Sequence, residues 1–135
     1  MPAPNEYVYA TPAVVAANTS FLNLVDAGTN GGKIQLYTND DTLLSTVRLG
    51  DANAKPSGVV DSGTGTLTFT IEGPDISADN SGTCTYGVIT DDAGTILLSI
   101  PTVAGAAPVN GYLVLNSTSI VSGSQVTVVS AVIGA

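Results

Sequence analysis

Apolar and polar residues alternate along most of the chain after residue 33. The clearest case is 66–71 (TLTFTI), where Leu67, Phe69 and Ile71 share one face and threonines occupy the other. A period of two with many β-branched residues is typical of antiparallel strands that are buried on one side. The pattern predicts strands at 33–37, 43–49, 66–71, 83–89, 95–100, 112–115 and 125–133.

Alternation also assigns residues to faces. In the segment 43–49, Leu43 and Leu49 are expected on one face, with Leu44 and Arg48 on the other. The arrangement predicts that Leu43 and Leu49 point into the core together and that Arg48 points outward.

Turn-forming residues separate the predicted strands. Asx-rich or Gly-containing groups lie at Asn39–Asp41, Asp51–Asn53, Asp92–Gly94, Asn110–Gly111 and Ser122–Gly123. Strands and turns are regularly spaced, and no helix long enough for a parallel crossover is predicted. The chain is therefore predicted to be all-β, an antiparallel β-sandwich or jelly roll of about seven or eight strands.

The N-terminal part differs from the rest. Prolines disfavour a helix over residues 1–18, which are predicted to form an extended N-terminal arm. This arm is either a disordered terminus or a segment that orders on a neighbouring chain. Residues 19–27 have apolar residues at helical spacing and predict one short helix of about two turns, capped by Asn18 or Thr19. Residues 19–135 are expected to form a single β-sandwich domain.

The charge balance limits the partners. With 11 acidic and 3 basic residues, the chain carries a net charge of −8. It has almost nothing to neutralise phosphates, so neither nucleic acid nor an anionic membrane surface is expected as a partner.

The inventory of reactive side chains is small. The chain has no His and no Trp, so Ser-His and Cys-His pairs are ruled out and the strongest stacking platform for sugars is missing. The one cysteine, Cys84, can form no internal disulfide, and it shares a predicted face with Tyr86 and Val88. We expect Cys84 to be a small buried hydrophobic residue. No enzymatic activity, cofactor or metal site is predicted.

Clustered acidic residues are the remaining candidates for chemistry. They occur at Asp40–Asp41, at Asp91–Asp92 and in the loop 72–82, which holds Asp75 and Asp79. Carboxylates this close can bind calcium, but the spacing is not that of an EF-hand. Asp and Asn also concentrate in turns because they bond to local backbone groups. We therefore expect turn capping rather than calcium binding or a glycosidase-like carboxylate pair.

The predicted exterior is rich in Thr, Ser, Asn and Ala and poor in Lys and Glu. Such a surface suits burial against other protein subunits, because little charge must be desolvated. Tyr7, Val8 and Tyr9 give the arm an apolar character, and Arg48 is an outward cation that either pairs with a partner's carboxylate or stays solvated. These four residues are the candidate interaction residues.

Three sequence blocks follow one another in a recognisable order. A short helix and the turn and strand AGTNGGKIQLYT (27–38) precede ISADNSGTCTYGVITDDAGTILLS (76–99) and YLVLNSTSIVSGSQVTVVSAVI (112–133). In their order and spacing, over about residues 19–133, these blocks resemble small proteins encoded among the structural genes of tailed bacteriophages. The family is that of the capsid cement, or head decoration, proteins.

The resemblance implies a jelly-roll fold and a structural role on the virion. Proteins of that family lie on the outside of phage heads and bridge major capsid subunits, often as dimers or trimers. The implied partners are therefore the major capsid protein and further copies of this chain. Synthesis in the host cytoplasm is expected, because no charged leader precedes the first basic residue, Lys33. The alternatives are a phage tail or head-fibre component and a β-sandwich module that binds sugar or calcium.

Overall fold

The computed structural model describes residues 9–134 of the chain. Within that range the chain forms one helix, α1 (Thr11–Val25), and the remaining regular structure is strand. The strands in chain order are β1 (Lys33–Tyr37), β2 (Leu43–Arg48), β3 (Gly58–Val60), β4 (Leu67–Phe69), β5 (Gly82–Thr83), β6 (Tyr86–Thr90), β7 (Ile96–Ala104), β8 (Tyr112–Leu115), β9 (Ser119–Ile120) and β10 (Val128–Ile133). The predicted all-β class with an N-terminal helix is confirmed.

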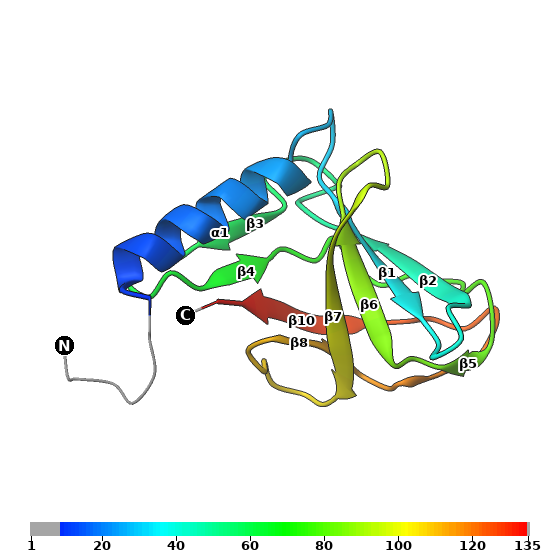
Figure 1. Ribbon diagram of the computed structural model, residues 1–135. Coiled ribbons are helices and arrows are strands. Elements are labelled where there is room, and N and C mark those ends of the chain that lie inside the picture. The colour runs from blue at the N-terminus through cyan, green and yellow to red at the C-terminus, as the bar shows by residue number, and fades with distance from the viewer. Residues whose placement is uncertain (1–8, 135) are drawn as a thin grey trace.

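Eight strands form one sheet in the order β2-β1-β6-β7-β8-β10-β4-β3, and β5 pairs with β9 in a small separate ribbon. The sheet curls so that its ends approach each other (Figure 1). The end of β2 meets the chain that follows β4 through a bridge between Leu49 and Ile71, and the N–H of Glu72 donates to the carbonyl of Arg48 at 3.0 Å. The fold is therefore sandwich-like, with opposite parts of one curled sheet facing each other.

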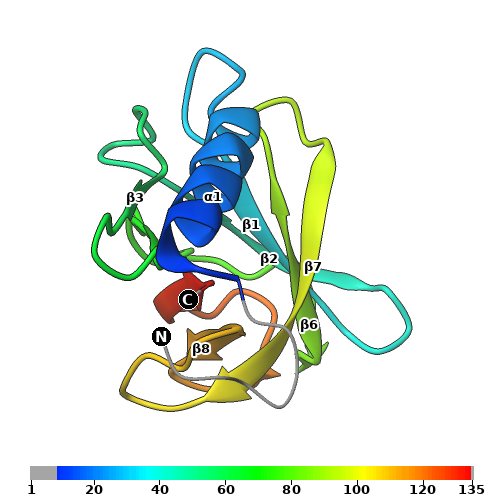
Figure 2. The ribbon, with the colours of Figure 1, turned by 60° about the vertical axis from the view of Figure 1, so that its left-hand side comes forward.

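The hydrophobic core fills the inside of the curled sheet. Helix α1 packs against β3 and β4 and covers one side of this core (Figure 2). Val25 is fully buried, and the rings of Phe21 and Phe69 meet edge to face with centroids 6.4 Å apart. Each large buried side chain stabilises the fold by roughly 1.5–3 kcal/mol. The largest ones in the strands include Ile34, Leu36, Leu44, Leu67, Ile89, Leu113 and Leu115.

Helix α1 begins at Thr11, well before the predicted start at residue 19. The prediction of an extended arm is therefore wrong over residues 11–18, and residues 1–8 lie outside the described part. Pro12 does not prevent the helix, because it occupies the first turn, where a missing N–H costs no hydrogen bond. Asn18 is inside the helix rather than at its cap, and its amide donates to the carbonyl of Gly65 at 2.6 Å.

The strand β2 contains a bulge that simple alternation misses. Ser45 pairs with Leu36 and Leu43 pairs with Tyr37, so Leu44 is an extra residue in the ladder. Leu44 is fully buried and Leu43 only partly so, which reverses the predicted assignment of these two residues. Arg48 is exposed, as predicted.

Other strands of the structure also differ from the predicted ones. The predicted strand 83–89 is split into β5 and β6, and the short strands β3 and β9 were not predicted. Segments of two or three residues are too short to show a period. Their pairing with β4 and β5 defines them instead.

The pairing of β7 with β8 is parallel, whereas all the other strand pairs are antiparallel as predicted. Parallel neighbours usually need a connection of about a dozen or more residues. Here the shorter segment 105–111 suffices, because only Thr102–Ala104, at the end of β7, pair with β8. The connection 105–111 therefore runs back along only the last few residues of β7. It places Asn110 and Gly111 beside the same groove as residues of α1.

Candidate interaction surface

Charged residues are confined to part of the chain. All three basic residues and ten of the eleven acidic residues lie in 26–92, and the remaining one is Glu6. The segments 7–25 and 93–135 therefore contain no charged residue. A soluble protein surface usually carries about a quarter charged residues, so two long charge-free segments mark an unusual surface.

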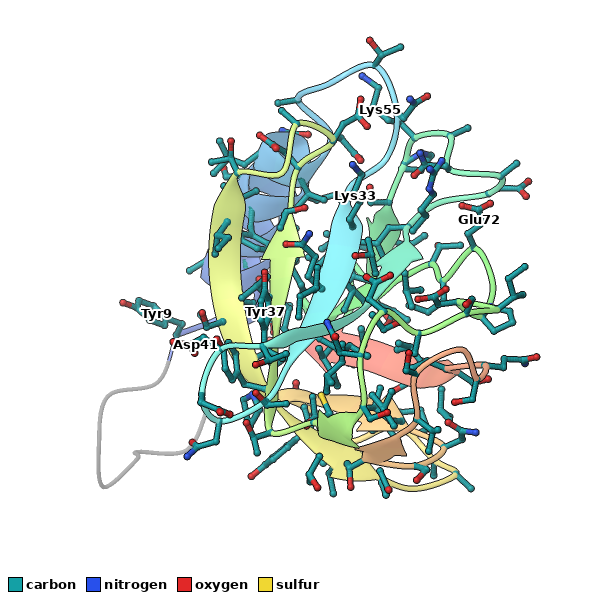
Figure 3. All side chains as sticks on the ribbon, turned by 90° about the vertical axis from the view of Figure 1, so that its right-hand side faces the viewer. Tyr9, Lys33, Tyr37, Asp41, Lys55 and Glu72 are labelled. Atoms are coloured by element: carbon teal, nitrogen blue, oxygen red, sulfur yellow. The ribbon has the colours of Figure 1, made fainter. Side chains whose placement is uncertain are left out.

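The fold brings the two charge-free segments together. The first supplies α1, and the second supplies β7, β8 and β10, which are neighbours in the sheet. The end of β10 lies below the start of α1 (Figures 1 and 2). Among the labelled charged side chains, Lys33, Lys55 and Glu72 lie apart from Tyr9, whereas Asp41, between β1 and β2, is drawn beside Tyr9 in this view (Figure 3).

An apolar groove forms where these two segments meet. Its volume is about 620 Å³, and among residues 9–134 no charged residue lines it. Two residues next to its lining, Val109 and Tyr112, are 43% and 40% exposed, so apolar surface continues beyond it. We call this feature the apolar groove, lined by Tyr9, Ala13, Val14, Ala17, Asn110, Gly111 and Gly134.

Hydrogen bonds hold the walls of the apolar groove in place. The amide of Asn18 ties α1 to Gly65, and the N–H of Gly111 donates to the carbonyl of Val132 at 2.8 Å. The groove is therefore built on a helix, on the turn before β8 and on the residue after β10, and a hydrogen bond joins this turn to β10. The described residues that line it include no carboxylate, amine or thiol, so it can bury a protein surface with little desolvation cost.

The predicted interaction residues lie in different places. Tyr9 is 69% exposed and lines the apolar groove, while Tyr7 and Val8 lie outside the described residues. Arg48 lies elsewhere, beside a small polar hollow that Glu72 also lines. The structure therefore does not bring Arg48 together with Tyr9.

The surroundings of Arg48 are mixed in character. Arg48 and Lys33 are direct cross-strand partners, and like charges in that position repel. Glu72 and Asp75 line the same hollow and balance this charge, and Ile76 beside them is 79% exposed. A partner that contacts this hollow would meet both signs of charge.

The acidic residues cap turns and loops, as predicted. Asp91 accepts a hydrogen bond from the N–H of Thr95 at 2.8 Å, and Asp40 accepts one from the hydroxyl of Thr38 at 2.8 Å. Asp75 reaches further and accepts from the hydroxyl of Ser45 at 2.6 Å. Within residues 9–134, no three carboxylates or thiols cluster in a way that could hold a metal ion.

Two further groups have shifted pKa values. The rings of Tyr37 and Tyr86 stack with centroids 5.4 Å apart, and the Tyr86 hydroxyl donates to Asp41 at 2.5 Å. This hydrogen bond is the main cause that raises the pKa of Tyr86 to about 12. Cys84 is buried as predicted, and burial raises the pKa of its thiol. A thiol of this kind is unreactive.

No protein family, no curated protein and no solved structure matches this chain. Over the described part of the chain, no helix has the length and hydropathy required to cross a bilayer.

Sequence reasoning found only Tyr9 among the residues of the apolar groove. It missed Ala13, Ala17 and Asn110, because small or neutral residues carry no chemical signal of their own. A usable signal was present in the sequence, namely the absence of charge from 7–25 and 93–135.

Proposed function

We propose that this protein is a structural virion subunit, a capsid cement or decoration protein. It binds the outside of a phage head and bridges major capsid subunits. A role in protein contacts is supported by one observation, the uncharged surface with exposed apolar side chains around the apolar groove. The assignment to phage heads rests on the resemblance of the sequence blocks over about residues 19–133.

The mechanism follows from mass action. A protein that binds the assembled shell, and not free capsid subunits, shifts the equilibrium toward the shell. Many copies on one lattice add their contributions even when each contact is weak. Tyr7, Val8 and Tyr9 contact the major capsid protein through apolar surface, and Arg48 contributes a charged contact elsewhere.

The first experiment follows the native protein in a lysate of its source. An antibody against the purified chain detects it across a sucrose gradient. We expect it to sediment with a particle of megadalton mass, and electron microscopy of that particle separates a head location from a tail or fibre location. A chain found only in the light fractions would refute a stably bound cement protein.

A pair of variants tests the arm. Replacing Tyr7 and Tyr9 by Ala removes two aromatic side chains, each of which contributes binding through buried area at an interface. We expect at least a tenfold loss of occupancy on purified capsids. The control is Val121→Ala, which shortens an exposed apolar side chain that does not line the apolar groove. Unchanged occupancy of the double variant would eliminate the arm as a capsid contact.

A further inference from the structure

We propose that the polar hollow beside β2 binds the carboxy-terminal end of another polypeptide, held by Arg48 and by free backbone groups of β2. The hollow has a volume of about 270 Å³ and lies between residues 46–48 of β2 and the loop 72–76. Glu72, one of its lining residues, lies apart from Tyr9 and so from the apolar groove (Figure 3). The inference does not depend on a role in a capsid.

The hollow forms where strand pairing along β2 stops. The chain that follows β4 pairs with the end of β2 through the antiparallel bridge between Leu49 and Ile71. Continued in this register, residue 74 would face Thr46, but Pro74 has no N–H to donate to the ladder. The loop therefore leaves the edge of β2, and the hollow lies between the two.

Free backbone groups of β2 face this hollow. The N–H of Leu49 donates to the carbonyl of Gly32 at 2.9 Å, on the side of β1, so the alternation of the strand directs Thr46 and Arg48 the other way. The carbonyl of Arg48 accepts from the N–H of Glu72. Within residues 9–134, the N–H of Arg48 and the N–H and carbonyl of Thr46 have no hydrogen-bond partner. Such groups can pair with the backbone of another chain.

The outer wall of the hollow is held in place by Asp75. Its backbone exchanges two hydrogen bonds with Val126, at 2.9 Å and 2.7 Å, and its carboxylate accepts from the hydroxyl of the buried Ser45 at 2.6 Å. The loop is therefore tied both to β2 and to the chain before β10. A ligand meets a fixed hollow and does not have to order this loop first.

The hollow is closed at both ends along β2. At one end the N–H of Glu72 donates to the carbonyl of Arg48 at 3.0 Å, and at the other the N–H of Asp79 donates to the carbonyl of Leu44 at 2.8 Å. A strand cannot run through the hollow alongside β2, so only the end of a chain can enter. The volume agrees, because it lies just below the range of about 300–1,000 Å³ that is usual for small-molecule pockets.

The charges favour a carboxylate end over an amino end. Within residues 9–134 Arg48 forms no ion pair, and its direct cross-strand partner is Lys33, a second cation. A guanidinium with adjacent backbone N–H groups suits a carboxylate, which accepts several hydrogen bonds at once. Both carboxylate oxygens of Asp75 already accept hydrogen bonds, which leaves Glu72 as the opposing charge in the lining. Ile76 on the rim is 79% exposed and offers an apolar contact to the last side chain of the ligand.

A pair of peptides gives the first test. The acetylated peptide Thr-Val-Thr-Val, with a free carboxylate end, is titrated into the full chain and followed by the backbone amide signals in nuclear magnetic resonance. We expect the signals of Thr46 and Arg48 to shift with a dissociation constant of about 1 mM, and the same peptide with an amide end to bind about tenfold more weakly. No shift of these signals at about 10 mM peptide, or equal binding of the two peptides, would overturn the proposal.

Matched variants give the second test. Arg48→Gln removes the cation of the hollow, and Lys55→Gln removes the same charge from an exposed loop residue that does not line it. We expect Arg48→Gln to weaken binding of the carboxylate peptide about tenfold and Lys55→Gln to leave it within about twofold. Glu72→Gln removes the opposing charge and keeps the backbone bond to Arg48, so it should strengthen binding.

The outcomes separate the possible ligands. Circular dichroism confirms that each variant is folded. If Glu72→Gln weakens binding and Arg48→Gln does not, the hollow binds a cationic group and the proposal is overturned. A chain that binds the carboxylate peptide but sediments with no particle refutes the cement function alone. A chain that sediments with a particle but binds neither peptide overturns the present inference alone.

Discussion

Ser57 is a buried residue that joins three separate elements through hydrogen bonds. It is fully buried, and its hydroxyl donates to Asp26 at 2.6 Å, just after the end of α1. The same hydroxyl accepts from the buried N–H of Gly32 at 2.8 Å, just before β1, and Ser57 itself precedes β3. We predict that Ser57→Ala loosens the attachment of α1 to the sheet.

The expected cost is the sum of two losses. A hydrogen bond to a charged group contributes about 1.5–3 kcal/mol, and a buried donor left without a partner costs about 1–3 kcal/mol. The N–H of Ser57 still donates to Asp26, which retains part of the link. We therefore expect Ser57→Ala to lower the free energy of unfolding by about 3 kcal/mol, and the melting temperature by about 10 °C.

Chemical denaturation in urea with linear extrapolation measures the effect. Asp26→Asn keeps an acceptor but removes the charge, so we expect a smaller loss of about 1 kcal/mol. Ser62→Ala, in the exposed turn after β3, is the control, with an expected change within about 0.5 kcal/mol. The reasoning would be refuted if Ser57→Ala lost less than about 0.5 kcal/mol of unfolding free energy, or if Asp26→Asn lost more than Ser57→Ala.

Two further predictions concern backbone strain and ionisation. Gly50 and Gly94 have nearly equal φ values of +93° and +92°, but a Cβ at Gly50 would collide with the carbonyl oxygen of Ala54, whereas Gly94 has open space around it. Urea unfolding should show a loss of about 1–2 kcal/mol for Gly94→Ala and about 1–3 kcal/mol more for Gly50→Ala; equal losses would contradict this. The Tyr86 hydroxyl has its pKa raised to about 12 from 10.0, chiefly by its hydrogen bond to Asp41, so its stabilising effect is present below pH 10 and is lost as pH rises toward 12. Absorbance at 295 nm should show Asp41→Asn shifting this titration to lower pH, and an unshifted titration would exclude the hydrogen bond as the cause.

Local sequence determined where most strands and turns lie. Alternation located β1 and β4 closely, and a continuous apolar run located β8, whose last three residues are buried. The turn at Asp92–Gly94 was equally readable, since it combines an Asx side chain with a glycine at positive φ. Burial of Cys84 also followed from its place in an alternating segment.

Packing between distant segments decided the rest of the fold. The start of α1 at Thr11 depends on contacts with β3 and β4 and on the bond from Asn18 to Gly65, which no local window contains. The bulge at Leu44 depends on the partner strand β1. The parallel pairing of β7 with β8 depends on where the return segment 105–111 finds partners.

The sequence by itself determined that this is an acidic, histidine-free, all-β chain, and it predicts Tyr9 as a contact residue. It also contained the two charge-free segments, although nothing in their order along the chain says that they meet. Only the tertiary structure decided this, because the apolar groove combines α1 with residues that follow it by almost the whole length of the chain. Composition fixes which segments can be buried against a partner, and chain topology fixes which of them share a surface.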